Sequence, residues 1–367
     1  MVRVLQMVGS LDIGGSQIMV MNLYRAMDRE RVQFDFIVDR PDKMFFAEEI
    51  KALGGKVYVM PQFKGTNISK IKKAWKKFFL EHPEYKVLHS HVRSYASIYL
   101  PIAKKCGVKT IIHSHSTSEG KGLKNFVKRV LERPLRRQAD YLMACSADAG
   151  VWLYGKRAVQ KENYFFIPNA IDIEKYSYNE SVRAQYRKDL GVEGKYVIGH
   201  VGRLHPSKNH LFLLDVFKEV KAKRQEAMLL IVGDGDLREK VEEKIEQLGL
   251  QESIIMAGAR KDVAQLMQAM DTFVFPSVWE GLPVTVVEAQ TSGLPCFISD
   301  TITEECIFSK RAKRLSISDK RAWVEAIADI KGEMNAPLEN LAGNTFDIRR
   351  SAEFFVNFYN NLVISEK

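Results

Sequence analysis

The sequence predicts an α/β protein built from two Rossmann-like domains, each a doubly wound parallel sheet. Three observations lead to this fold class. The 367 residues suffice for about two domains of roughly 150 residues each. Short β-branched or aromatic runs alternate with segments of helical periodicity in both halves, and strands joined by crossover helices pair in parallel. No periodicity survives within residues 172–195, where Asn, Asp, Tyr, Ser and Gly cluster, so a domain boundary is expected there.

In the first half, the expected strands are residues 2–8, 32–38, 57–60, 86–89, 109–113, 140–145 and 164–167, with helices such as 18–27 and 68–80 between them. In the second half, the expected strands are 196–201, 228–232, 253–257, 272–275 and 295–298, and the clearest helices are 211–223, 238–248 and 284–292. Ligands of such sheets bind beyond the carboxyl ends of the strands, so the chemistry is expected in the loops there. With two facing domains, a central cleft is the expected binding site.

We expect an N-terminal domain at residues 1–185, a C-terminal domain at 186–350, and a last segment at 351–367 whose Phe and Tyr residues recur at helical spacing. Hydrophobic residues make up 46% and charged residues 27% of the chain, which excludes a largely disordered protein. The four cysteines lie far apart without a C-x-x-C pair, so neither a zinc site nor a disulfide scaffold is expected. No signal segment and no apolar run of about 18 residues occurs, which favours a cytoplasmic location.

The positive charge of the chain belongs to its first half. Residues 1–185 contain 31 Lys and Arg against 18 Asp and Glu, a net charge of +13, whereas the remainder contains 24 against 27, a net charge of −3. This asymmetry predicts an anionic partner for the first domain, such as a lipid headgroup, a nucleic acid or a phosphorylated substrate. No recognition motif supports nucleic acid.

Two loops at expected carboxyl strand ends carry candidate chemistry. After the strand at 196–201 come Gly202, Arg203 and Lys208: the glycine permits close backbone approach, and the two cations suit a phosphate group. An ordinary solvent-exposed basic loop would have the same residue pattern.

After the strand at 272–275 come Glu280, Gly281 and Leu282, and Glu288 follows inside the next helix. The start of that helix offers backbone amides to an anion, and Glu288 could accept hydrogen bonds from ribose hydroxyls. Each carboxylate alone would be read as an ordinary surface residue.

Taken together, GRLHPSKN and EGLPVTVVEAQTSGLP resemble the retaining glycosyltransferases of family 4, which have the GT-B fold and an E-x7-E signature, here Glu280 and Glu288. The order of elements matches over nearly the whole chain. The resemblance implies transfer of a sugar from a nucleoside diphosphate sugar, the donor, to a hydroxyl of a glycan or lipid-linked glycan in cell-surface polysaccharide synthesis. It also implies front-face attack with no enzymic nucleophile, and a last helix that crosses back to the N-terminal domain.

The resemblance also assigns roles to donor-site residues. Arg203 and Lys208 would hold the diphosphate beside Gly202. Glu280 and the amides of Gly281 and Leu282 would lie near the donor sugar and phosphates, Glu288 would bind the ribose, and Arg260 would lie beside the nucleobase. Gly14 and Gly15 match a loop of the first domain that approaches the donor phosphates.

A family histidine near the donor sugar maps to the stretch His113–Ser114–His115. We prefer His113, which ends the strand, although a shift of two residues would select His115. His91, which follows the neighbouring strand, and Asn169, in the P-N-A-I-D match at the domain junction, are further candidates for contact with the sugar or the acceptor.

No metal cofactor is expected. Asp234, Gly235 and Asp236 form a D-x-D pattern, but the match is weak, and we expect Asp236 to cap the following helix. With Arg203 and Lys208 available, the charge of the leaving group can be neutralised without magnesium.

Two basic segments of the first domain, 68–80 and 121–137, carry apolar residues at helical spacing between many Lys and Arg residues. Either these segments bind an anionic membrane surface, or their apolar stripes face the core and their basic faces are solvated. The first alternative would make the protein peripheral at the inner face of the membrane. Two other functions stay open: a non-catalytic donor-binding subunit of a synthase complex, and a nucleotide-sugar epimerase.

Overall fold

A computed structural model describes residues 1–12, 14–115, 123–330 and 345–364. The chain divides into two compact units: residues 1–170 with 345–367, and residues 171–344. The division at 170 falls before the boundary expected at 185, because residues 171–185 pack with the second unit. The segment after 344 returns to the first unit.

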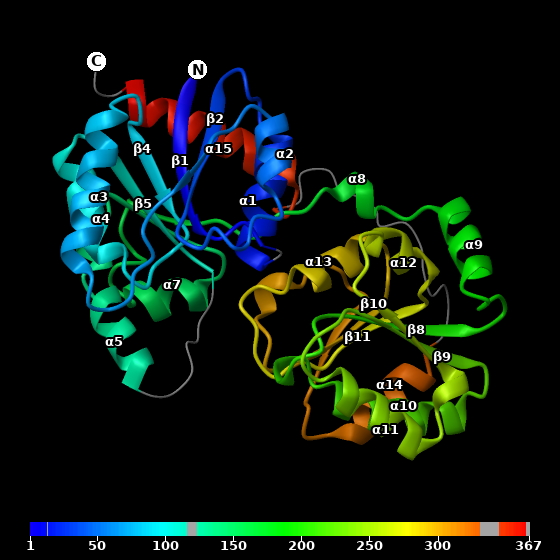
Figure 1. Ribbon diagram of the computed structural model, residues 1–367. Coiled ribbons are helices and arrows are strands. Elements are labelled where there is room, and N and C mark those ends of the chain that lie inside the picture. Colours follow the sequence, from blue (N-terminus) through cyan, green and yellow to red (C-terminus); the bar gives the residue numbers. More distant parts are fainter. Residues whose placement is uncertain (13, 116–122, 331–344, 365–367) are drawn as a thin grey trace. The chain divides into compact units, whose positions relative to one another are not determined.

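The first unit contains a sheet of seven parallel strands in the order β3-β2-β1-β4-β5-β6-β7 (Figure 1). The strands are β1 (Val2–Gly9), β2 (Val32–Val38), β3 (Val57–Val59), β4 (Val87–Ser90), β5 (Lys109–Ser114), β6 (Tyr141–Ala144) and β7 (Tyr164–Phe166). All seven were expected within one or two residues, because each is a short, mostly apolar run. The inner strands are largely buried, whereas the edge strands β3 and β7 are only partly buried.

Helices cover both faces of this sheet. They are α1 (Gly15–Ala26), α2 (Ala47–Ala52), α3 (Ile68–Glu81), α4 (Ala96–Lys105), α5 (Leu123–Glu132), α6 (Leu135–Gln138), α7 (Ala147–Tyr154) and α15 (Ile348–Ile364). Helices α1, α2 and α15 form one core with the sheet, and α15, drawn in red, lies beside β1 and α1 (Figure 1). Tyr359 and Phe355 of α15 are buried there.

The second unit contains a sheet of six parallel strands in the order β10-β9-β8-β11-β12-β13. The strands are β8 (Tyr196–Val201), β9 (Ala227–Val232), β10 (Ile254–Gly258), β11 (Thr272–Phe275), β12 (Cys296–Ser299) and β13 (Ala312–Leu315). The sequence did not predict β13, whose pattern A-K-R-L is polar and only partly buried at the edge of the sheet.

The helices of the second unit are α8 (Ile173–Tyr176), α9 (Glu180–Asp189), α10 (His210–Lys223), α11 (Arg238–Leu248), α12 (Val263–Ala269), α13 (Val284–Thr291) and α14 (Lys320–Ala328), with short 3₁₀ turns at Pro206–Lys208, Gln251–Ser253 and Glu304–Cys306. Helices α10, α11 and α14 share one core with the sheet. Two doubly wound parallel sheets confirm the predicted fold class. No helix among the described residues is both long and apolar enough to span a bilayer.

Candidate functional site

In the second unit, the carboxyl ends of β8, β9 and β10 are joined by backbone hydrogen bonds. The amide of Gly202 donates to Val232 O at 2.9 Å, and the amide of Gly233 donates to Gly258 O at 2.8 Å. Gly233 has a φ of +138°, and a Cβ there would lie 2.0 Å from Gly202 O. Only glycine fits at this point, so the loop that follows β8 is held in one place against its neighbours.

Lys208 and Glu280 connect the two sequence motifs. Lys208 Nζ lies 2.6 Å from Glu280 Oε1, and both side chains are about one-sixth exposed (16% and 17%). The amide of Val278 donates to Ser207 O at 2.8 Å, and Lys208 Nζ lies 4.7 Å from the centre of the Phe275 ring. The loops after β8 and β11 therefore meet, as expected for neighbouring strands of one sheet.

Gly281 and Leu282 lead from this ion pair into α13. Leu282 is buried and Gly281 is partly exposed. Pro283 occupies the N-cap position of α13, where no side chain caps the first amides. The start of this helix is therefore a place where backbone N–H groups can meet an anion.

Glu288 lies one turn into α13, and its carboxylate accepts a hydrogen bond from the hydroxyl of Tyr176 in α8. Burial raises the pKa of Glu288, and the hydrogen bond to Tyr176 opposes that rise. Sequence reasoning missed Tyr176, because residues 172–195 were read as a connecting segment. The only signal was an aromatic residue within that polar stretch.

The other charged residues near these loops are paired with one another. Arg203 Nη2 lies 3.1 Å from Asp236 Oδ2, and both side chains are well exposed. Arg238 binds Asp234 at 2.9 Å. The expectation that Asp236 caps a helix was wrong: α11 begins at Arg238 after Leu237 and has no side-chain cap, because the Asp236 carboxylate turns to Arg203.

Arg260 makes a two-pronged contact with Asp262, with distances of 2.8 Å and 2.6 Å. The hydrogen bonds from Arg260 lower the pKa of Asp262 to about 2. This pair fixes the guanidinium in the loop after β10. It stands at the strand end where the nucleobase was expected.

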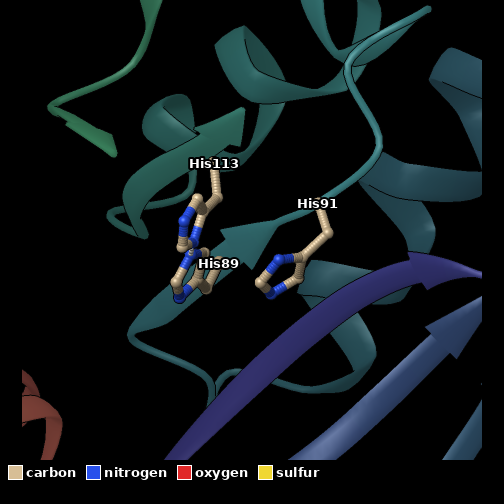
Figure 2. Close-up of side chains that lie close together, drawn as sticks. All are labelled: His89, His91 and His113. Atoms are coloured by element: carbon tan, nitrogen blue, oxygen red, sulfur yellow. Dashed lines mark hydrogen bonds between the residues drawn. The ribbon is translucent and has the colours of Figure 1, made fainter. Parts of the chain in front are cut away.

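In the first unit, four histidines gather at the carboxyl ends of β4 and β5, and Figure 2 shows three of them, His89, His91 and His113, with His89 and His113 facing each other. His89 Nε2 lies 3.3 Å from His113 Nδ1, and His91 Nδ1 lies 2.8 Å from His115 Nε2. Side chains two positions apart share a face of a sheet, which explains why His-x-His on two neighbouring strands forms one cluster.

The outer ring nitrogens of this cluster also have partners. His89 Nδ1 lies 2.7 Å from the Tyr359 hydroxyl of α15, and His91 Nε2 lies 3.0 Å from Gln6 Oε1 of β1. Burial lowers the pKa of all four histidines, to about 3 for His89 and His115. The cluster is therefore a network of neutral imidazoles. One ring nitrogen each of His89, His91 and His113 could hold a metal ion, but at His89 and His91 these nitrogens already have partners.

Exposure separates the two candidate histidines. His113 is fully buried within β5, and His115 is partly exposed just beyond it. Residue exposure therefore favours His115 over the preferred His113, although both ring nitrogens of His115 are covered, because Nε2 meets His91 and Nδ1 is buried. His113 Nε2 and His115 Nδ1 have no hydrogen-bond partner among the described residues.

The remaining candidates of the first unit lie in two places. Gly14 is the N-cap of α1, and Gly15 begins that helix, is exposed, and has nothing within 4 Å of an added Cβ. Asn169 is 7% exposed at the end of the unit, and its Oδ1 has no partner within the described part of the chain.

The apolar stripe of α3 faces the core. Ile71, Trp75, Phe78 and Phe79 are buried, and Trp75 stacks on Tyr99 of α4 with ring centres 4.4 Å apart. Of the two readings of this segment, the structure favours a core-facing stripe with a solvated basic face. Lys121 and the side chains of 123–127 lie outside the described residues.

Two doubly wound sheets, with a Gly-Arg…Lys loop that meets an E-x7-E segment in the second unit, define the GT-B class of glycosyltransferases. Residues 182–339 match the family model described as glycosyl transferases group 1, and residues 13–175 match that of glycosyltransferase family 4. The chain belongs to the retaining glycosyltransferases of family 4.

The chain is 34% identical to EpsF of Bacillus subtilis (strain 168), a protein named as a glycosyltransferase, over 98% of this chain and 96% of that one. It is 24% identical, over 78% of each chain, to the UDP-Gal:α-D-GlcNAc-diphosphoundecaprenol α-1,3-galactosyltransferase of Escherichia coli. Among solved structures, Anabaena Alr3699/HepE in complex with UDP and glucose has a TM-score of 0.80 at 18% identity, covering 98% of this chain and all of that one. At that identity the likeness shows the fold.

Proposed function

We propose that this glycosyltransferase transfers a sugar from a nucleoside diphosphate sugar to a hydroxyl of a glycan or lipid-linked glycan in cell-surface polysaccharide synthesis, with retained anomeric configuration. The observation that carries the proposal is the contact of Lys208 with Glu280, which joins the two motifs. Uridine diphosphate sugars are the first donors to test, because the E. coli relative is named for UDP-Gal and the Anabaena structure for UDP.

Lys208 and Arg203 would neutralise the diphosphate, which approaches closely over Gly202. The amides of Gly281 and Leu282 and the start of α13 would add hydrogen bonds, with Glu280 orienting Lys208. Glu288 would accept hydrogen bonds from the ribose, and Arg260, held by Asp262, would lie beside the base. These groups stabilise the departing diphosphate without a metal ion.

In the first unit, His115 and His91 would contact the sugar or acceptor, with Asn169 as a further polar contact. His113 would orient His115 from inside the sheet. Gly14 and Gly15 would bring the start of α1 to the phosphates.

In the proposed reaction, the acceptor oxygen bonds to the anomeric carbon on the face that the diphosphate leaves. The bond from that carbon to the diphosphate oxygen breaks, and the acceptor proton passes to a phosphate oxygen of the leaving group. The lysine and arginine stabilise the negative charge that develops there, so no enzymic nucleophile is required.

We also propose that the protein works at an anionic membrane surface. The net charge of +13 on residues 1–185 and the exposed lysines of α3 support this, as does an acceptor linked to a polyprenyl diphosphate in the E. coli relative's name. Flotation with anionic liposomes at low salt tests the association. If the liposomes do not capture the protein at low salt, the membrane proposal is contradicted.

Donor binding is tested by melting temperatures of the purified protein with nucleoside diphosphates and their sugars, with and without EDTA. A ligand that binds only the folded state raises the melting temperature. Arg203→Ala and Glu288→Ala should abolish the shift. Arg321→Ala and Glu325→Ala, which break an exposed ion pair on α14, should preserve it, and EDTA should leave it unchanged. No shift with any nucleotide would refute donor binding.

A further inference from the structure

An open groove of about 850 Å³ lies between the end of α3 and the end of α4, where β4 and β5 begin. Its lining residues are Lys72, Lys73, Lys76, Phe79, Leu80, Pro83, Tyr85, Lys86, Ile102, Lys105, Cys106 and Val108. The volume is within the range of about 300–1,000 Å³ typical of small-molecule sites. The groove belongs to the first unit and is separate from the donor loops of the second.

The lining combines an apolar floor with a rim of one charge. The five lysines of the lining are all exposed, and no acidic side chain lines the groove in the part of the chain that the structure describes. Leu80 leaves 67% of its surface exposed. An apolar floor beneath five cations is complementary to a molecule with an apolar chain and an anionic head.

The groove is preformed. The buried stripe of α3 packs on α4 through Trp75 and Tyr99. Helices α3 and α4, which form the walls of the groove, are therefore held in place by core contacts. Side chains that face the groove are not needed to hold them. A site that exists before binding loses little entropy when a ligand enters.

We propose that this groove binds one anionic lipid, with an acyl chain over Phe79, Leu80 and Ile102 and a phosphate head between the lysines. The inference deepens the proposed membrane association and rests on it: a defined lipid site replaces general adsorption of a basic surface. The lipid is an anchor and not the acceptor, because the groove lies where β4 and β5 begin, whereas His91 and His115 follow the ends of these strands.

Cys106 provides a built-in probe of this groove. It lines the groove and is partly exposed, whereas Cys145, Cys296 and Cys306 are buried. Alkylation of Cys106 by iodoacetamide, followed by mass spectrometry of the full-length protein, therefore reports access to the groove. The ligand used is dioctanoyl-phosphatidylglycerol as dispersed monomers.

At a lipid concentration of ten times its dissociation constant, alkylation of Cys106 should slow by about tenfold, because only the free fraction reacts. Dioctanoyl-phosphatidylcholine and inorganic phosphate should slow it less than twofold. Equal protection by the zwitterionic lipid, or protection by phosphate alone, would overturn the proposal. Protection that rises with protein concentration without lipid would assign the groove to a second copy of the chain and would also overturn it.

Matched variants on one helix separate a site from general charge. Lys72→Glu with Lys76→Glu changes the rim, and Lys70→Glu with Lys77→Glu makes the same change in charge on exposed residues of α3 outside the lining. Lys72→Glu with Lys76→Glu should abolish the protection of Cys106 by the lipid, and so should Leu80→Asp alone. Lys70→Glu with Lys77→Glu should keep that protection. Equal loss in both pairs would show adsorption by charge and refute the groove.

The melting shift with UDP is measured on the same variants and should be unchanged, because the donor loops lie in the second unit. An absent UDP shift in the unaltered protein would refute the donor proposal and leave the lipid result standing. Flotation without Cys106 protection would refute the groove and leave the membrane proposal standing.

Discussion

Lys208 and Glu280 are 72 positions apart in the sequence, and their side chains meet at 2.6 Å. Both side chains are largely screened from water. Removing one of them would leave the other as an unpaired, poorly solvated charge, which costs free energy unless another charged group takes its place. A bound diphosphate could take the place of the Glu280 carboxylate as the anionic partner of Lys208. The ion pair therefore holds the lysine ammonium group in the loop where the proposed leaving group would lie.

Lys208→Ala should weaken UDP binding more than UMP binding, because the lost cation serves the second phosphate. A hydrogen bond to a charged group contributes about 1.5–3 kcal/mol, so the dissociation constant for UDP should rise roughly 10- to 100-fold. Isothermal titration with UDP and UMP measures this. Lys218→Ala, at an exposed position of α10, is the control, and an equal loss for both nucleotides would contradict the role.

Glu288 should make donor binding depend on pH. Burial raises its pKa above the ordinary 4.5, and the ionised form is the better acceptor for ribose hydroxyls. UDP affinity should therefore increase as the pH rises through the raised pKa. In Glu288→Gln the affinity should be weaker and flat over that range.

The same carboxyl affects stability with the opposite sign. The folded state holds the proton more tightly than the unfolded state, so its contribution to the free energy of unfolding falls as the pH rises above about 4.5. Urea unfolding of the unaltered protein and of Glu288→Gln at several pH values measures the slope of the free energy of unfolding against pH. A slope that is unchanged in Glu288→Gln would contradict the assignment.

His115→Ala should lower the transfer rate by roughly tenfold, the effect of one lost hydrogen bond of about 1–1.5 kcal/mol, with little change in melting temperature. His113→Ala should instead destabilise the protein by about 1–3 kcal/mol, because the change lies inside the sheet. Because burial lowers the pKa of His115 to about 3, the rate should show no titration of this histidine near pH 6.5. Equal effects of both changes on rate alone would contradict this division of roles.

At the scale of single residues, the motifs predicted which side chains lie in the loops after β8 and β11, but not the partners of these side chains. Lys208, Glu280 and Glu288 belong to patterns with fixed spacing, whereas Tyr176, Gln6 and Tyr359 reach their partners only through the packing of distant segments. The difference in burial between His113 and His115 depends on where β5 ends, which the sequence pattern does not fix to within two residues.

At the scale of elements, the buried strands were predictable because apolar runs and sheet burial coincide. The short helices were not: α4 contains Pro101, and α8 has only four residues. The apolar stripe of α3 left two readings open, because a face turned to the core and a face turned to a membrane have the same periodicity.

Helix α15 should stabilise the first unit alone. Removing residues 351–367 deletes Phe355 and Tyr359 from its core, so the first unit should unfold while the UDP-dependent transition of the second unit persists in calorimetry. Tyr359→Phe should cost about 1–3 kcal/mol, because it leaves His89 Nδ1 unpaired. Tyr141→Phe, whose ring also packs against α15, is the control, and loss of only the UDP-dependent transition would contradict this account.

At the scale of the whole molecule, the positive charge is concentrated in the first half of the chain. The first half has a net charge of +13 and the second half a net charge of −3. The basic half is therefore suited to anionic partners, whereas the loops after β8 and β11 depend on the individual cations Arg203 and Lys208. The sequence predicted this division, because charge is additive along the chain. The exact boundary was not predictable, because α8 and α9 pack with the second unit through contacts such as Arg183 with Asp271.

The measurement that tests the central claim most directly is the anomeric configuration of the product. The purified protein is incubated with UDP-sugars and a synthetic polyprenyl diphosphate-linked GlcNAc acceptor, and proton NMR gives the coupling constant at the new linkage. The account predicts an α-linked product from an α-linked donor, formed equally with EDTA present and lost in Lys208→Ala. A β-linked product, or an epimerised donor without transfer, would contradict it.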